Sequence, residues 1–532
     1  MSEVHVKYFD TTLRDGTQGE NISFSAEDKI RIARKLDSLG IHYIEGGWPG
    51  SNPKDMEFFE RAKDEHFKNA RIVAFGSTMR FGNTPESDPN IQALINAQTP
   101  AVSIFGKTWT LHVEQALGIT GDQNLTLIHD SVQYLKSQGR EVIYDAEHFF
   151  DGYNDNSKYA ISTLNAARLA GADWIVLCDT NGGTLPHDIQ SIVQDVIKKV
   201  DAPIGIHAHN DAEMAVANSV TAVQFGCRQV QGTINGYGER CGNANLCSII
   251  PNLQIKLGFE GIKMENLAQL TTISHYVSEL ANLSHNNQLP YVGKSAFAHK
   301  GGIHVSAVIK NPVTYEHIEP ELIGNGRRVL LSDLSGQSNI RFKAEELNLN
   351  LDEHNHVIPE IVKTLKQKEH EGFMYEAAEA SLELLIKKIT QDTADAFEFK
   401  GFRMLIEKNE NEVIRSEATI RVNVNGILEH TAAESVGPVH ALDQALRKAL
   451  MKFFPEIDEM QLSDYKVRVL NEKDATKARV RVLIDSTCNG ETWGTVGVSE
   501  NIIEASWQAL MESFSYYLIN HYKHQPIVQE SA

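Results

Sequence analysis

Short apolar runs of β-forming residues alternate with longer segments of helical period up to about residue 260. Eight such runs occur, at residues 4–9, 43–48, 71–75, 101–105, 141–144, 174–178, 204–207 and 229–234. Strands that alternate with helices in this way are typical of a parallel α/β architecture. Eight units favour a closed (β/α)8 TIM barrel, and an open doubly wound sheet is the alternative.

The segment from Ser25 to Gly40 shows how the helical intervals are delimited. Its apolar residues recur at helical spacing, with Ser25 at the expected N-cap and Gly40 where the chain leaves the helix. In a barrel of such units the carboxyl ends of all eight strands meet at one face. Residues far apart in the sequence can therefore form one site there.

The barrel is predicted to span residues 1–265 and to carry the catalytic site. Residues 266–396 have a mostly helical period, interrupted by the glycine- and arginine-containing segment 321–328. We expect this stretch to form a helical connector that contributes to the active site.

A weak internal repeat marks residues 397–525 as a separate domain. Segment 418–426 and a helix at 438–454 are echoed by segment 478–485 and a helix at 501–517. The repeat predicts two β-β-α units, and therefore an α+β domain with approximate twofold symmetry.

Composition narrows the class of partner. Acidic residues outnumber basic ones, 70 against 50, which gives a net charge of -20 and a pI near 5.5. Such a surface repels nucleic acid and anionic lipid. With no targeting or membrane-spanning segment in the sequence, we expect a cytoplasmic protein without nucleic-acid or membrane partners. The five cysteines form no C-x-x-C pair and are expected to be reduced.

The residues suited to metal binding follow the predicted strands. His207 and His209 are spaced i, i+2 at the seventh run, which in a strand places both rings on one face. Asp15 follows the first run and Asn243 the eighth. Because these strand ends converge in a barrel, the four residues are predicted to hold one divalent ion. Cys241 with Cys247 is a weaker alternative, since soft ligands would not use the oxygen groups nearby.

Two neutral imidazoles and one carboxylate leave the ion positively charged, with open positions for a chelating substrate. A 2-oxo acid suits such a site through its carboxylate and ketone oxygens. Arg14 can stabilise the alkoxide that forms when the ketone is attacked. Glu147, Asp145, His304 and Tyr315 offer acid and base groups for a carbon nucleophile. Mg2+ or Mn2+ is favoured by the oxygen ligands, and Zn2+ is the alternative.

Other enzyme classes lack their sequence motifs here. The sequence has neither a catalytic serine or cysteine elbow nor a Walker phosphate loop. The segment Gly236–Gly238 matches a dinucleotide fingerprint only in part, because the third glycine is missing.

Six motifs, in this order, resemble the isopropylmalate synthase and homocitrate synthase superfamily. They are Thr11–Gln18, Glu45–Pro49, Cys178–Gly182, His207–Asp211, Gly238–Asn243 and His299–His304. The C-terminal repeat resembles the amino-acid-sensing domain of the same superfamily. Within it, the segments Tyr144–Gly152, Asp179–Pro186 and Thr314–His317 are most similar to the citramalate synthase group.

The resemblance implies condensation of acetyl-CoA with pyruvate to give (R)-citramalate and CoA, in isoleucine biosynthesis. It implies a metal at Asp15, His207 and His209, supported by Asn243. One position departs from the pattern, because some citramalate synthases have tyrosine where this chain has Asp145.

The resemblance also distributes the remaining roles. Arg14 and Thr180 would hold the 2-oxo acid, and Asp145 would contribute to the substrate pocket. Glu147 would take part in proton transfer, with His304 and Tyr315 completing the acetyl-CoA side. The last two residues come from the segment after the barrel.

Three rival functions stay open. A 2-isopropylmalate synthase would accept 2-oxoisovalerate at the same metal, and pocket size would separate the two substrates. A lyase would run the reverse cleavage, and an inactive barrel would only sense metabolites. For regulation we expect isoleucine to bind near Gly437 and Gly497, at turns before the two repeat helices, in a homodimer.

Overall fold

The computed structural model of the protein describes residues 4–330, 336–347, 349, 355–390, 396–408, 414–470 and 478–521. Contacts divide the chain into two compact units. The first comprises Met1–Phe297 and His317–Arg327, and the second comprises Ala298–Glu316 and Arg328–Ala532. The first unit therefore extends beyond residue 265, where the sequence pattern places the end of the barrel.

Eight parallel strands close into a barrel in sequence order, which confirms the predicted fold and excludes the open sheet. The barrel closes where β1 pairs with β8, with Phe9 opposite Gln231. The strands are β1 (Lys7–Asp10), β2 (Tyr43–Gly47), β3 (Arg71–Ser77), β4 (Ala101–Lys107), β5 (Glu141–Glu147), β6 (Trp174–Asp179), β7 (Ile204–Ala208) and β8 (Gln229–Gly232).

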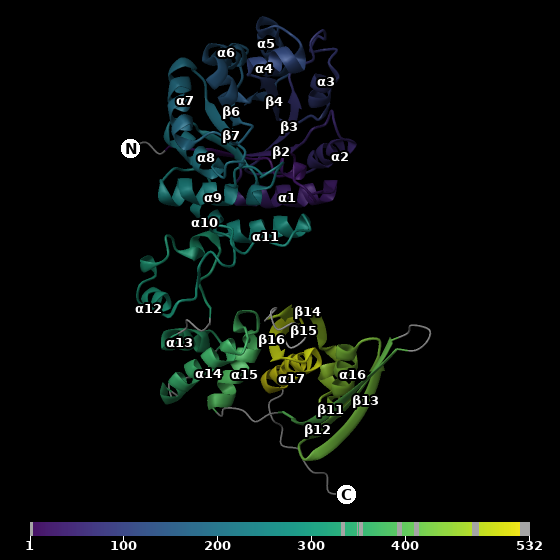
Figure 1. The fold of residues 1–532 in the computed structure, drawn as a ribbon. Helices are drawn as coiled ribbons and strands as arrows, with labels where there is room; N and C mark the ends of the chain where they lie inside the picture. The colour runs from purple at the N-terminus through teal and green to yellow at the C-terminus, as the bar shows by residue number, and fades with distance from the viewer. Residues whose placement is uncertain are drawn as a thin grey trace. The chain divides into compact units, whose positions relative to one another are not determined.

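Helices surround these strands in Figure 1. They are α1 (Ala26–Leu39), α2 (Pro53–Ala62), α3 (Pro89–Asn96), α4 (Thr110–His112), α5 (Gly121–Ser137), α6 (Phe149–Leu169), α7 (Pro186–Lys199), α8 (Ala215–Gln224), α9 (Leu246–Pro251), α10 (Met264–Leu267) and α11 (Leu270–Leu280). The ends of α1 follow the sequence prediction. Ser25 forms a capping box with Asp28, and Gly40 ends the helix at φ 104°, where a side chain would be strained.

The inside of the barrel is apolar at one level and polar above it. Alternate residues of a strand share a face, so an apolar ring that includes Phe9, Ile143 and Val176 closes the interior. Further along the same strands the inward positions become polar, as at Asp145 on β5. The polar level lies toward the carboxyl ends of the strands, and the site forms there.

The second unit begins with a helical part. It contains β9 (Ala298–His299), α12 (Gly302–Lys310), β10 (Arg328–Val329), α13 (Gln337–Glu346), α14 (Ile358–His370) and α15 (Glu379–Thr390). None of the helices in the described part of the chain is long and apolar enough to cross a membrane.

The C-terminal repeat has three strands in each half, so the predicted β-β-α unit is wrong by one strand. Both sheets are antiparallel, and a helix follows each. The first half is β11 (Glu398–Lys408), β12 (Ile414–Val424), β13 (Ile427–Ser435) and α16 (Pro438–Leu450), and the second is β14 (Gln461–Val469), β15 (Val480–Cys488), β16 (Glu491–Ser499) and α17 (Ile502–His521). The missed strands β11 and β14 do carry alternating apolar residues, such as Phe402, Met404 and Ile406 in β11, although none of their residues is fully buried.

The two glycines expected at turns have different surroundings. Gly437 is the N-cap of α16, as predicted. Gly497 lies within β16, opposite Val482, so its predicted position at a turn is wrong. A Cβ at Gly497 would come within 2.0 Å of the carbonyl oxygen of Ala505, which explains why only glycine fits where α17 crosses the sheet.

Candidate active site

Three side chains of the kinds that can ligate a metal ion converge at the carboxyl ends of β1 and β7. Among the described residues, Asp15, His207 and His209 form the one group of three whose ligand atoms all lie within 4.8 Å of one another. His207 Nε2 is 3.3 Å from Asp15 Oδ2, and all three side chains are buried. Cys241 is exposed and belongs to no such group, so the cysteine alternative gains no support.

Several polar atoms around this group have no hydrogen-bond partner among the described residues. They are Asp15 Oδ1, His209 Nδ1, and both Oδ1 and Nδ2 of Asn243. Asn243 pairs with His209 in an isolated β-bridge, which holds the amide beside the imidazole. Unsatisfied buried polar atoms are costly, and a bound ion could be ligated by the oxygen and imidazole nitrogen atoms of this set, though not by the amide Nδ2. The donor set therefore fits a divalent metal.

The charges of this cluster suit metal binding. Burial alone would raise the pKa of Asp15, but Arg14 and His207 hold that pKa well below its usual range. Burial, together with the charge of His207, lowers the pKa of His209 to about 3, so its imidazole is neutral. Despite burial, hydrogen bonding to Asp15 raises the pKa of His207. Metal binding at Nε2 requires the neutral form of His207, so the affinity for the ion should depend on pH.

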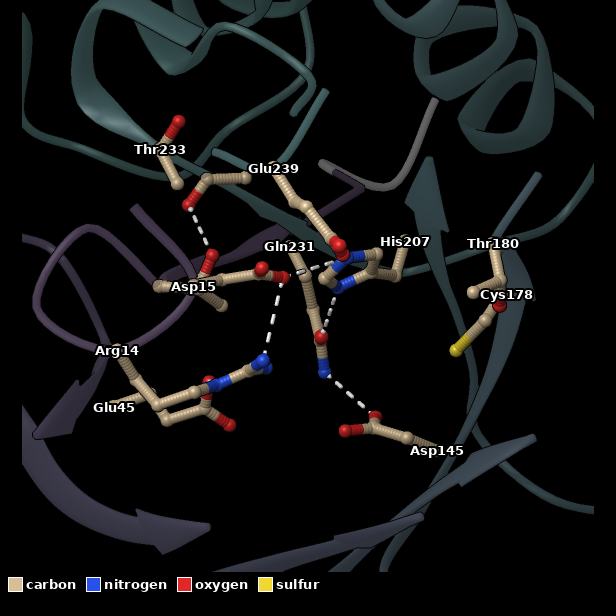
Figure 2. Close-up of polar contacts among 12 residues, drawn as sticks. Arg14, Asp15, Glu45, Asp145, Cys178, Thr180, His207, Gln231, Thr233 and Glu239 are labelled. Carbon is tan, nitrogen blue, oxygen red and sulfur yellow. Dashed lines mark hydrogen bonds and ion pairs between the residues drawn. The ribbon is translucent and has the colours of Figure 1, made fainter. Parts of the chain in front are cut away.

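Arg14 is fixed as a cation at the edge of the cluster. Its Nε donates to Glu45 Oε2 at 2.6 Å, and its NH1 lies 3.5 Å from Asp15 Oδ2. Its guanidinium stacks on Phe75, 3.7 Å from the ring centroid. Burial would lower the pKa of Arg14, but Asp15 and Glu45 raise it above the usual value. Figure 2 shows Arg14 pointing toward Asp15.

Asp145 supports His207 through Gln231. Ser103 Oγ donates to Asp145 Oδ2 at 2.6 Å, and Gln231 Nε2 donates to Oδ1 at 3.0 Å. Gln231 Oε1 lies 2.7 Å from His207 Nδ1, so Gln231 bridges the two residues in Figure 2. Burial raises the pKa of Asp145. Both oxygens of Asp145 already have partners, so its most direct structural role is to orient the histidine.

Glu147 lies at the rim, two residues beyond Asp145 on the same face of β5. Its carboxylate forms an ion pair with Lys107 of β4. Thr180, after β6, accepts a hydrogen bond from the backbone of His148 at its side-chain oxygen, at 2.9 Å. This bond ties the segment after Glu147 to the segment after β6.

A cavity of about 220 Å³ brings most of the predicted residues together. From the predicted set it is lined by Arg14, Asp15, Asp145, Glu147, Thr180, His207 and His209. The wall also includes Trp48, Phe75 and Phe105, three aromatic rings packed on one another.

His304 and Tyr315 belong to the second unit, where their ring centroids lie 4.4 Å apart. Tyr315 is 47% exposed. Their predicted roles beside acetyl-CoA stay predictions.

Three features of the site were not predicted from the sequence, namely Lys107, Gln231 and the aromatic wall. A signal for Lys107 exists, because Ser103, Phe105 and Lys107 alternate along one strand and must share a face. For Gln231 the pairing register is also needed, and a single sequence does not supply it.

Comparison with known proteins covers nearly the whole chain. An "HMGL-like" family model matches residues 5–276, a "Homocitrate synthase post-HMGL domain-like" model matches 291–372, and a "LeuA allosteric (dimerisation) domain" model matches 376–518. An (R)-citramalate synthase of Aquifex aeolicus is 57% identical over 97% of this chain and 98% of its own. An (R)-citramalate synthase of Geobacter sulfurreducens is 58% identical over 96% of this chain and 97% of its own.

The chain belongs to the (R)-citramalate synthase family. Both the superfamily and the group that the motifs indicate are thereby confirmed. A probable 2-isopropylmalate synthase of Methanopyrus kandleri is 31% identical over 95% of this chain and 97% of its own. The two (R)-citramalate synthases named above are thus much more similar to this chain, at 57% and 58% identity, than this relative from the rival group, at 31%.

Proposed function

We propose that the protein catalyses the condensation of acetyl-CoA with pyruvate, giving (R)-citramalate and free CoA. One observation carries the proposal: Asp15, His207 and His209 face a cavity that Arg14 and Glu147 also line. A metal site, a fixed cation and a rim carboxylate are the groups that carbon-bond formation at a 2-oxo acid requires. Family membership supports the choice of acetyl-CoA and pyruvate as substrates.

A divalent ion held by Asp15, His207 and His209, with Asn243 beside them, would polarise the ketone and orient the 2-oxo acid. Mg2+ or Mn2+ suits this mixed oxygen and nitrogen set with open positions, and Zn2+ is the alternative.

The side chains around the cavity would then have separate roles in the reaction. Arg14 faces the substrate as a permanent cation and stabilises negative charge that develops on the ketone oxygen. Thr180 hydrogen-bonds the 2-oxo acid. Glu147 accepts a proton from the methyl group of acetyl-CoA, and the resulting carbon nucleophile adds to C2 of pyruvate. Water then cleaves the thioester and releases the thiol of CoA. His304 and Tyr315 of the second unit act on the acetyl-CoA side.

The aromatic wall favours pyruvate over larger 2-oxo acids. Trp48 packs edge-on against Phe75 and Phe105, with ring centroids 5.5 and 5.8 Å apart. Trp48 Nε1 also donates to Asn90 Oδ1 at 2.8 Å, which fixes its ring. A rigid wall leaves little room for the branched side chain of 2-oxoisovalerate, the substrate of the rival 2-isopropylmalate synthase. An inactive sensor would have no need to retain the complete set of polar groups.

Product analysis tests this function. The purified protein is incubated with acetyl-CoA, pyruvate and Mg2+ or Mn2+, and free thiol and citramalate are both quantified. The proposal predicts one citramalate per thiol released, loss of both signals with a chelator, and recovery with added metal. Thiol release without citramalate would contradict it, as would full activity in a demonstrably metal-free sample.

We also propose that residues 397–525 bind isoleucine in a homodimer and inhibit the barrel, as feedback in isoleucine biosynthesis in the cytoplasm. Effector and active site would couple by about 1 to 3 kcal/mol. The match to an allosteric and dimerisation domain model supports this proposal.

Gly437 offers the sharper test of regulation. A Cβ there meets nothing within 4 Å among the described residues, whereas one at Gly497 strikes backbone. Gly437→Leu should reduce inhibition by isoleucine and preserve uninhibited turnover. If isoleucine, leucine and valine all leave the wild-type rate unchanged at saturation, the domain does not sense these amino acids.

A further inference from the structure

Two polar side chains on the inner face of β4 each contact a carboxylate of β5, one deeper in the barrel and one at its rim. The strands pair in parallel register, with Ser103 opposite Ile143 and Lys107 opposite Glu147. Ser103 reaches up to Asp145, and Lys107 pairs with Glu147 at the rim. The deeper pair belongs to the support of the metal ligands. The upper pair has no part in that support, and it involves the residue proposed to move a proton.

The position of Lys107 is fixed from two sides. Asn124 Nδ2 donates to the backbone oxygen of Lys107 at 2.8 Å, and Thr108 Oγ1 donates to the backbone oxygen of Glu147 at 2.6 Å. The ammonium of Lys107 lies 5.4 Å from the centroid of Phe105, which belongs to the cavity wall. The two strand ends are therefore tied together below the ion pair.

The ion pair is accessible from solvent. The side chain of Lys107 is 22% exposed and that of Glu147 is 23% exposed, and Glu147 also lines the cavity. Because the pair is partly buried, its contribution to folding stability has to be measured separately from its effect on turnover. A fall in turnover with an unchanged Tm would then come from what Lys107 does to Glu147.

We propose that Lys107 is a positioning residue for Glu147. The proposal rests on the function given above, in which Glu147 accepts the methyl proton. Proton transfer requires the carboxylate within hydrogen-bonding reach of the carbon acid, and small misplacements are costly. Lys107 selects one side-chain conformation of Glu147 at the rim.

A second lysine pair provides a matched control. Lys136 Nζ lies 2.6 Å from Asp173 Oδ2, with side chains 31% and 36% exposed. Asp173 immediately precedes β6, at the end of the barrel away from the site. Lys136→Met therefore removes a comparable charge and ion pair without touching the cavity.

The test compares the full-length variants Lys107→Met, Lys107→Arg, Glu147→Gln, Lys107→Met/Glu147→Gln and Lys136→Met. All are assayed with saturating metal, and metal content and Tm are measured for each. Lys107→Met is expected to lower kcat about 10- to 100-fold, with KM for pyruvate, metal content and Tm close to wild type. Lys107→Arg should recover most of the rate, because it keeps the cation.

The double variant separates positioning of Glu147 from an independent effect. If Lys107 acts through Glu147, the double variant is no slower than Glu147→Gln alone. The proposal is overturned if the kcat of Lys107→Met lies within about twofold of the values for wild type and Lys136→Met. It is also overturned if the fold-losses in kcat of the two single variants multiply in the double variant. If Glu147→Gln itself keeps the wild-type rate, the proposed role of Glu147 fails instead, and the two failures are distinguishable.

Discussion

The Nδ1 atom of His207 lies 2.7 Å from Oε1 of Gln231. The amide of Gln231 is oriented by Asp145, because its Nε2 donates to the carboxylate at 3.0 Å. An amide oxygen accepts hydrogen bonds only, so the proton of neutral His207 must sit on Nδ1. The lone pair of Nε2 then faces Asp15, 3.3 Å away, which is the arrangement that a metal ligand needs.

This relationship predicts that Gln231→Leu weakens metal binding. Without the acceptor, the ring loses its fixed tautomer and orientation, and the affinity for Mn2+ should fall about 10- to 100-fold. Titration of metal-stripped protein with Mn2+, followed by electron paramagnetic resonance, measures the change. Gln133→Leu, at an exposed position of α5 that does not line the cavity, is the control and should bind Mn2+ nearly as wild type does. Equal affinities for all three proteins would show that Gln231 does not orient His207.

Loss of a metal ligand and loss of the proton acceptor should have separable effects. His209→Ala removes a ligand, so the purified protein should retain less metal, and activity should recover only at higher metal concentration. Glu147→Gln preserves the ligand set, so metal content should stay at the wild-type level while kcat falls about 100-fold or more. Metal analysis beside steady-state kinetics distinguishes them. Retained metal in His209→Ala would remove His209 from the ligand set.

The aromatic wall can be tested by enlarging the cavity at Phe105. Phe105→Ala removes a ring that packs on Trp48 and Phe75, so the branched chain of 2-oxoisovalerate gains room. The ratio of kcat/KM for 2-oxoisovalerate to kcat/KM for pyruvate should rise about 10- to 100-fold, the range expected for one or two methylene groups. Phe81→Ala, at a ring that is 57% exposed, should not change this ratio. An unchanged ratio in both variants would place substrate selection elsewhere.

A half-buried carboxyl in the second unit, that of Glu512, predicts a dependence of stability on pH. Burial raises the pKa of Glu512 from 4.5 to about 7, although Ser381 donates a hydrogen bond to it. Because the folded state binds this proton more tightly, the free energy of unfolding should fall as pH rises from about 4.5 to about 7. At pH 8, Glu512→Gln should therefore raise the free energy of the unfolding that exposes β16 to exchange by on the order of 2 kcal/mol. At pH 5 the same substitution should change this free energy little.

Hydrogen exchange of residues 491–499 checks this, because the amide of Val496 donates to Ser381 at 2.9 Å. Variant and wild type are compared at the same pH, so intrinsic exchange rates cancel. Glu504→Gln, on the same helix, serves as the control. Equal protection of wild type and Glu512→Gln at both pH values would mean that Glu512 is ionised in the folded state.

The barrel and most of its site could be predicted because each strand has its own local signal. His207 and His209 share a face by strand periodicity alone, and Asp15 reaches them because all strand ends meet at one face. Gln231 and Lys107 act across neighbouring strands, and pairing register is a tertiary property that one strand does not encode. The strands β11 and β14 were not predicted although their apolar residues alternate, and their side chains stay partly or largely exposed.

The specificity constant for the 2-oxo acid tests the central claim most directly. The metal-loaded protein is assayed by thiol release from acetyl-CoA, with pyruvate, 2-oxoisovalerate and 2-oxoglutarate compared at subsaturating concentration. We predict the highest kcat/KM for pyruvate, because the cavity combines a fixed cation with a rigid aromatic wall. A higher kcat/KM for 2-oxoisovalerate would contradict the proposed reaction and identify the protein as a 2-isopropylmalate synthase.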